Sequence, residues 1–276
     1  MNRSKTLLGA AVIAATLATA NAQVVLSTAA NGTFTTSQNF NTLANTGTTV
    51  TWTDNSTITG WYAAKQQGFG FPAIGTYRPG KGDDNTPTTG AVWSFGSSSS
   101  SDRALGSVGS GTPGTQTYGV RFQNTSGTKT VNGLTVSYTG EQWRDGGNTT
   151  AQILAFSYRI SSRAITSSDA ADANTWTSFT SLDFVSPIHT ATAAALDGNA
   201  VANRQTFSSV ALTGVSLSPG QELFLRWKDV NDTGNDHGFG VDDFTLGYTT
   251  VPEPSTYALF AGLGLLGFGV WRRARR

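Results

Sequence analysis

The stretch Tyr118-Gly119-Val120-Arg121-Phe122-Gln123 alternates large apolar side chains with small or polar ones. The same alternation recurs in residues 134–139 and in residues 223–229, where Leu223, Leu225 and Trp227 share one face. A period of two residues is typical of a strand that buries one face, because successive side chains of a strand point to opposite sides. These three segments therefore predict β-strands.

Similar short segments occur throughout residues 24–248. We count roughly a dozen of them, separated by turns rich in glycine, asparagine and serine. No segment in this region has the length and periodicity of a helix that could cover a sheet. Many short strands without covering helices favour two packed antiparallel sheets. The sequence thus predicts an all-β fold for residues 23–249, a two-sheet antiparallel β-sandwich of jelly-roll-like form.

Three connections within and after this domain carry specific expectations. Residues 167–174, with Ser168 as a cap and alanines inside, predict one or two helical turns. Residues 186–204 contain many turn-forming residues and predict a long loop. Residues 249–256 are rich in proline and threonine, and we expect them to form a linker to the C-terminal segment.

The N-terminus has the three parts of a secretory signal peptide. Arg3 and Lys5 precede an apolar run over residues 7–20, and Ala20-Asn21-Ala22 is an A-x-A cleavage site. We expect residues 1–22 to form a signal helix that directs export through the Sec machinery and is then removed.

The C-terminus also has three parts. Pro252-Glu253-Pro254 is followed by an apolar segment over residues 257–271 and by four arginines within residues 272–276. The apolar segment has 15 residues and would reach about 22 Å as a helix. A transmembrane helix usually takes about 20 residues, so this segment is short for a span. The arginines favour a cytoplasmic C-terminus. The segment predicts a short C-terminal transmembrane helix. The alternatives are a core helix and a helix lying on the membrane surface.

This pattern resembles the PEP-CTERM sorting signal of Gram-negative bacteria, and the resemblance covers residues 250–276 only. In that family, the triplet that corresponds to Pro252, Glu253 and Pro254 marks the region processed by an exosortase, a membrane-embedded cysteine transpeptidase. The resemblance implies a transient stay in the inner membrane, removal of the helix, and delivery to the cell surface or to a biofilm matrix of exopolysaccharide. It implies nothing about the activity of the preceding domain.

Removal of both terminal segments reverses the sign of the net charge. The whole chain has 18 basic and 17 acidic residues, and the two segments hold six of the basic residues but one of the acidic ones. Residues 23–251 therefore carry 12 basic and 16 acidic residues, a net charge of −4. Such a domain has no basic footprint for nucleic acid, so we expect no nucleic-acid partner.

The scarcity of two residue types excludes several kinds of site. The chain has no cysteine, which rules out disulfides, thiolate metal sites and a cysteine nucleophile. Its two histidines argue against a multi-histidine zinc site.

Residues 229–243 contain five aspartates and two asparagines, interspersed with glycines. Hard oxygen ligands on a tight loop suit Ca²⁺, although Thr233 and Gly240 break the spacing of an EF-hand. The alternative is a polar loop whose side chains cap their own backbone. The predicted calcium ligands are Asp229, Asn231, Asp232, Asp236 and Asp242.

Three functions remain open for the domain, and one of them is a purely structural matrix protein with no ligand. A non-enzymatic surface or matrix protein would contact exopolysaccharide through aromatic rings, and Trp61 and Trp143 are the candidates. A secreted glycan hydrolase or lyase would need two carboxylates across a cleft, which Glu141 with Asp145 or Asp243 would supply. The alternative for residues 141–145 is a surface ion pair between Arg144 and a carboxylate, beside a core tryptophan. We expect the non-enzymatic function, with no catalytic residues.

Overall fold

The structure of the chain is a computed structural model. It describes residues 23–28, 30–68, 70–80, 88–98, 100–112, 114–168, 175–252 and 254–275. The predicted signal peptide, residues 1–22, lies outside the described residues, and so does most of the helical turn predicted for residues 167–174.

A first sheet of seven strands follows the path β1-β8-β15-β10-β11, with β4 on β8 and β12 on β10. Its strands are β1 (Val24–Leu26), β4 (Trp61–Lys65), β8 (Gln116–Asn124), β10 (Ile153–Ser161), β11 (Thr177–Ser178), β12 (Phe184–Val185) and β15 (Glu222–Asp229).

A second sheet of nine strands follows the path β13-β9-β16-β7-β6-β5-β3, with β14 on β9 and β2 on β16. Its strands are β2 (Gly32–Gln38), β3 (Val50–Thr51), β5 (Thr76–Pro79), β6 (Ala91–Phe95), β7 (Ala104–Val108), β9 (Lys129–Asp145), β13 (Ala194–Ala195), β14 (Arg204–Ala211) and β16 (Gly238–Pro252). The described helices are η1 (Thr180–Leu182), η2 (Val201–Asn203) and α1 (Pro254–Ala274).

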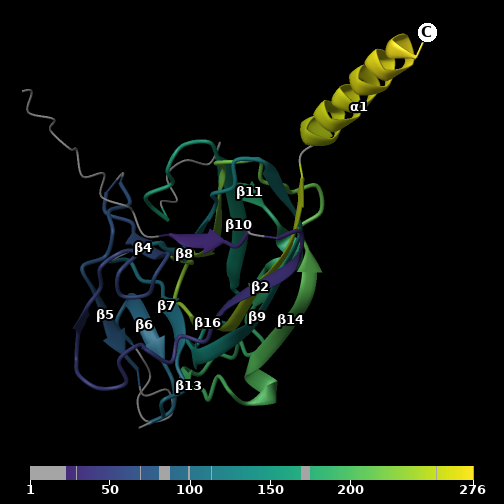
Figure 1. The fold of residues 1–276 in the computed structure, drawn as a ribbon. Helices are drawn as coiled ribbons and strands as arrows, with labels where there is room; N and C mark the ends of the chain where they lie inside the picture. The colour runs from purple at the N-terminus through teal and green to yellow at the C-terminus, as the bar shows by residue number, and fades with distance from the viewer. Residues whose placement is uncertain are drawn as a thin grey trace, which may run out of the picture.

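The prediction of a mostly β domain with two sheets is confirmed (Figure 1). Among the described strand pairs, all are antiparallel except β1 with β8 and β5 with β6, which are parallel. These two parallel pairs could not be predicted from the sequence, because the local pattern of a strand does not report which strand it pairs with or in which direction.

The apolar residues of the alternating segments form the core between the sheets. Tyr118, Val120 and Phe122 of β8 are all buried, as their period of two residues predicts. The opposite face of β15 differs from the prediction, because Phe224 and Arg226 are buried as well. They are covered by the segment around Trp176, whose ring lies 3.8 Å from the Arg226 guanidinium carbon.

Trp227 joins the two sheets at the centre of the core. Its ring stacks on Trp61 of the first sheet at 5.8 Å. It also meets Tyr138 and Phe244 of the second sheet edge-on, at 5.3 and 5.8 Å. These contacts explain why the sandwich closes here, since aromatic edge-to-face pairs add to the free energy gained by burial.

Two predicted connections have more structure than expected. The segment 176–184, just before the predicted long loop, contains β11, η1 and the start of β12. The long loop over residues 186–204 contains β13, η2 and the first residue of β14. The predicted linker over residues 249–256 is also wrong, because β16 extends to Pro252 and α1 begins at Pro254.

The helix α1 has 21 residues and projects away from the sheets (Figure 1). In the part of the chain that the structure describes, no helix combines the length and apolar character needed to cross a membrane. The C-terminal helix is therefore confirmed, and its membrane span is not.

Candidate functional site

The C-terminal segment that carries the Pro-Glu-Pro triplet begins inside the second sheet. Pro252 is the last residue of β16 and lies opposite Lys129 of β9. Proline ends the strand because it has no N–H for the next hydrogen bond of the ladder. Pro254 is the first residue of α1, where proline is favoured because its fixed φ suits a helix start. The triplet thus joins a strand directly to a helix.

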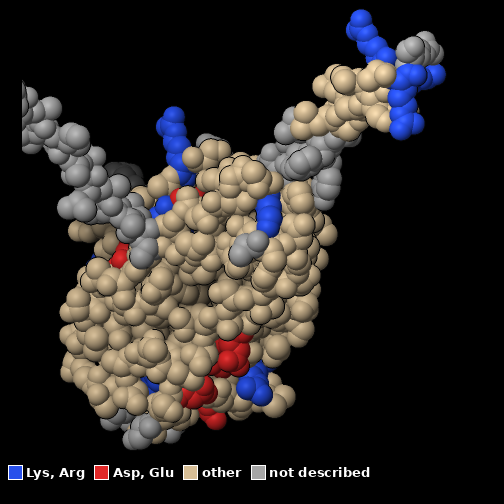
Figure 2. Space-filling view, in the orientation of Figure 1, with Lys and Arg blue, Asp and Glu red and all other residues tan. Residues whose placement is uncertain are grey.

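The far part of α1 is apolar and ends in positive charge. Large apolar side chains stay exposed along it: Leu263, Leu265, Leu266, Phe268 and Val270. Arg272 and Arg273 lie in its last turn, and Figure 2 shows the basic side chains gathered at its tip. A contiguous exposed apolar surface marks a site of contact with a membrane or a partner.

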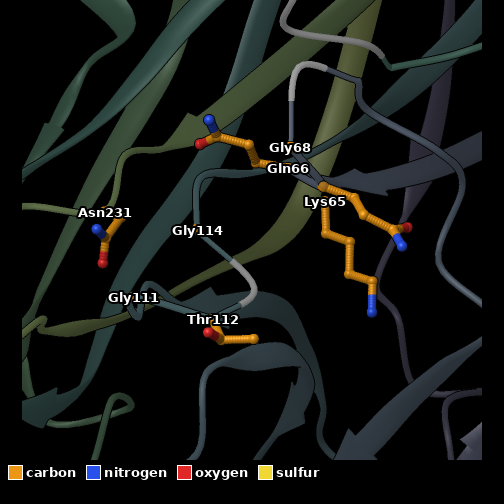
Figure 3. A pocket seen from close by; sticks show the side chains of 8 residues that line it. Lys65, Gln66, Gly68, Gly111, Thr112, Gly114 and Asn231 are labelled. Carbon is orange, nitrogen blue, oxygen red and sulfur yellow. The ribbon is translucent and has the colours of Figure 1, made fainter.

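A polar cleft of about 520 Å³ opens where three distant loops meet (Figure 3). Figure 3 shows the side chains of Lys65, Gln66, Thr112 and Asn231 around it. Thr115 ties these loops together, since its carbonyl accepts the Gln66 N–H at 2.8 Å and its Oγ1 accepts the Asn231 N–H at 3.4 Å. The lining residues are Lys65, Gln66, Gln67, Gly68, Gly111, Thr112, Gly114 and Asn231.

A second cleft, of about 240 Å³, shares Lys65 and Thr112 with the first. Gln116 lies in its wall, fully buried, and its Oε1 has no hydrogen-bond partner among the described residues. Lys65 and Arg78 are the charged side chains among the described lining residues, which include no aspartate or glutamate. The two clefts together offer amides, hydroxyls and two cations.

The five predicted calcium ligands do not form one site. Asp229 is buried, and its Oδ2 accepts a hydrogen bond from Ser107 Oγ at 2.6 Å. Asp236 Oδ1 accepts the backbone N–H of Asp232 at 2.8 Å, which is the capping alternative drawn from the sequence. Asn231 lines the polar cleft instead. Within the described residues, no group of three or more aspartates, glutamates or histidines could hold a metal ion.

Asp242 is not grouped with the other predicted calcium ligands, because the carboxyls that act on it are those of Glu141, Asp243 and Asp102. It lies on β16 in the second sheet, opposite Thr139, whereas Asp229 ends β15 in the first sheet. Burial, followed by the nearby Glu141 carboxyl, raises the pKa of Asp242 to about 8. Counting oxygen ligands along the sequence could not reveal which carboxyls the strands bring close to Asp242.

The two candidate tryptophans are both buried, so the prediction that they stack on a sugar is wrong. Trp61 and Trp143 are each 1% exposed. Trp143 stacks on Phe95 at 6.0 Å, on the outer face of the second sheet. Gly198 covers that ring so closely that a Cβ at this position would collide with it. Neither ring presents a face to a ligand.

Glu141 has the environment of a structural carboxyl. It is 2% exposed, its Oε2 accepts a hydrogen bond from Trp143 Nε1 at 2.8 Å, and burial raises its pKa to about 7. Asp145 lies four residues farther along β9, about 13 Å away at the usual rise per residue. That separation exceeds the range of about 5–9.5 Å for paired glycosidase carboxylates. Asp243, the other proposed partner, is exposed at the surface.

A buried pair that the sequence did not reveal is His237 with Asp145. His237 Nδ1 lies 3.4 Å from Asp145 Oδ1 and accepts the backbone N–H of Gly146 at 2.9 Å. Burial, more than any neighbouring charge, lowers the pKa of His237. Asp145 Oδ2 also accepts a hydrogen bond from Thr190 Oγ1 at 2.6 Å. The pair joins two loops in the interior, where His237 Nε2 is buried and has no hydrogen-bond partner among the described residues.

A comparison with protein families identifies the C-terminus of the chain. A search of the curated proteins found no match to the chain. Residues 250–276 match the family described as the PEP-CTERM protein-sorting motif. The match begins at Thr250, inside β16, and includes all of α1. The C-terminal region is therefore a PEP-CTERM sorting motif, which implies that the chain is exported and sorted to the cell surface by an exosortase.

Proposed function

We propose that the chain is a non-enzymatic component of the cell surface or extracellular matrix of a Gram-negative bacterium. In this proposal, residues 1–22 direct export and α1 holds the chain in the inner membrane for a short time. The exosortase then removes α1, and a jelly-roll-like sandwich remains. The mature domain binds exopolysaccharide, and the ligand is an acidic glycan held in the joined clefts around Lys65.

The chemistry of the cleft lining is the observation that carries the binding proposal. Gln66, Gln67 and Asn231 offer amide donors and acceptors, which match sugar hydroxyl groups. The cleft volume of about 520 Å³ falls within the usual range of ligand sites.

The charge of the cleft favours an acidic glycan over a neutral one. Lys65 lines both clefts and Arg78 lines the smaller one, with no aspartate or glutamate among the described lining residues, although the mature domain as a whole is acidic. Carboxylates that meet such cations form charge-assisted hydrogen bonds, which are stronger than neutral ones. The described lining residues also supply no carboxylate for acid–base hydrolysis, which favours binding.

One observation favours the alternative, a glycan hydrolase or lyase. The pKa of Glu141 is raised to about 7, which suits a general acid. Its burial and its hydrogen bond to Trp143 keep it from a substrate, however, and it lines neither cleft.

The binding proposal predicts a charge-dependent affinity. The mature protein should bind oligogalacturonate at low salt, and the double variant Lys65→Gln/Arg78→Gln should bind about tenfold more weakly, equivalent to about 1.4 kcal/mol. Arg163 is exposed and lines neither cleft, so Arg163→Gln is the matched control and should change the affinity less than about twofold. Isothermal titration calorimetry measures both.

Two results would contradict this proposal. One is wild-type protein that binds neither oligogalacturonate nor a neutral dextran. The other is a Kd for oligogalacturonate that the double variant and the Arg163→Gln control change equally.

A further inference from the structure

The last four residues of β16, residues 249–252, are held by their neighbours in the sheet. Thr249 and Thr250 pair with β9 on one side and with β2 on the other, where their partners are Thr33 and Gly32. Beyond Thr250, the pairing continues on the β9 side alone. We call residues 249–252, with their partners in β9 and β2, the C-terminal clasp.

Side chains strengthen the clasp at Thr250. The Thr250 side chain is 1% exposed, and its Oγ1 donates a hydrogen bond to the Ala30 carbonyl at 2.7 Å. On β9, the ammonium group of Lys129 donates to the Thr28 carbonyl at 2.6 Å. Thr28 and Ala30 both precede β2, so the N-terminal part of the mature chain holds the C-terminal strand in place.

The clasp leaves almost no chain between the folded domain and the processed triplet. Thr250, the last residue paired on both sides, is two residues from Pro252, about 7 Å along a strand. Pro252 itself still lies opposite Lys129 of β9. An enzyme that cuts or transfers a peptide bond must enclose the chain on both sides of that bond. On the N-terminal side of the triplet, the chain is still paired in the sheet.

We propose that the exosortase acts on this chain only after the C-terminal clasp has opened, so that the fold of the domain controls its own processing. Val251 and Pro252 are half-buried and paired on one side, so they open first. Thr250, paired on both sides and hydrogen-bonded through its side chain, sets the limit of that opening. Such local opening needs no global unfolding, because strand ends open at a lower free energy than the core.

The chain itself offers a clean test, since it has no cysteine of its own. Val251 lies opposite Thr130, and opposed residues of antiparallel strands have Cα atoms about 4.5–5.5 Å apart, within the range of a disulfide. The double variant Val251→Cys/Thr130→Cys therefore locks the clasp when oxidised. The matched control is Thr245→Cys/Ser37→Cys, which ties the same strand to β2 away from the triplet.

The full chain of each variant is incubated in membrane vesicles that contain the exosortase, and the processed fraction is followed by intact mass. We expect the oxidised clasp lock to be processed at least about tenfold more slowly than its reduced form. The control lock should change the rate less than about twofold. Equal rates for the oxidised and reduced clasp lock would overturn the proposal, and so would equal slowing by both locks.

A second variant keeps the test independent of disulfide formation. Thr250→Val preserves the β-branched shape but removes the hydrogen bond to Ala30, so the clasp should open more often. We expect its processing to be about two- to twelvefold faster, which corresponds to the net stabilisation of one hydrogen bond. An unchanged or slower rate would count against the clasp. Neither result depends on whether the mature domain binds a glycan.

Discussion

Replacing Trp227 with alanine is expected to lower the free energy of unfolding by about 3–5 kcal/mol, the usual cost of removing a large buried aromatic side chain. Trp227 is completely buried. Its ring contacts Trp61 and Phe156 in its own sheet, and Tyr138 and Phe244 in the other. The surrounding rings come from four strands of two sheets, so the cavity cannot close without a shift of the sandwich.

Urea denaturation followed by intrinsic fluorescence measures this loss. The matched control is Trp176→Ala, because Trp176 is half-buried and its ring covers Arg226 at the outer face of the first sheet. We expect the control to cost about 1 kcal/mol, since it removes part of one packing contact and one cation–π contact. If Trp227→Ala cost no more than Trp176→Ala, the position of Trp227 as the centre of the core would be wrong.

The folded domain is also expected to lose stability as the pH rises from about 4 to about 8. Burial raises the pKa of Asp229 and of Asp242 to about 8, and that of Glu141 to about 7. Between the pKa of about 4 of an unfolded carboxyl and these folded values, the folded state holds protons that the unfolded state has released. The free energy of unfolding then falls by about 1.4 kcal/mol per pH unit for each such proton.

The Asp229→Asn variant removes the titration of one of these buried carboxyls. Asn has the same shape as a protonated aspartate, keeps a donor, and still accepts the hydrogen bond from Ser107 Oγ. The strand register also places Gln116 opposite Asp229, with an Oε1 that lacks a donor among the described residues. We expect the variant to be more stable than the wild type at pH 8 and to have a shallower pH dependence. A slope of unfolding free energy against pH that matches the wild type would contradict this assignment.

The individual strands could be predicted from the sequence, because each depends on the local alternation of its own side chains. The alternation at Tyr118, Val120 and Phe122 is a property of one strand, and it correctly indicates a strand with a buried face. The cover over Phe224 comes from Tyr62, Ile165 and Trp176, which belong to distant segments. No local period reports such a contact, so the burial of β15 on both faces could not be predicted.

The same distinction separates the two candidate sites. The sorting motif is linear, so its triplet, apolar segment and arginines can be recognised without a structure. The cleft around Lys65 is built from glutamine, glycine, threonine and asparagine of three separate loops, and these residue types have no signature at that spacing. The sugar-binding prediction assumed that Trp61 and Trp143 are exposed. Both are buried, because a tryptophan ring is large and apolar and packs in the interior.

The linker prediction failed for a related reason. Proline and threonine near residue 252 are typical of a linker, but Thr250 also suits a strand because it is β-branched. Its partners in β9 and β2 lie more than a hundred residues away along the chain, at Val131 and Gly32. The clasp is therefore a product of tertiary pairing, and it places the folded domain directly against the processed region.

The central claim, that this chain is exported and sorted by an exosortase, is tested most directly by the intact mass of the protein outside the cell. Cells with and without the exosortase are compared. With the enzyme present, we expect an extracellular chain that lacks residues 1–22 and the part of α1 that ends in arginines. Without the enzyme, the chain should stay in the membrane fraction and end at Arg276. An extracellular chain that ends at Arg276 in both strains would contradict the account.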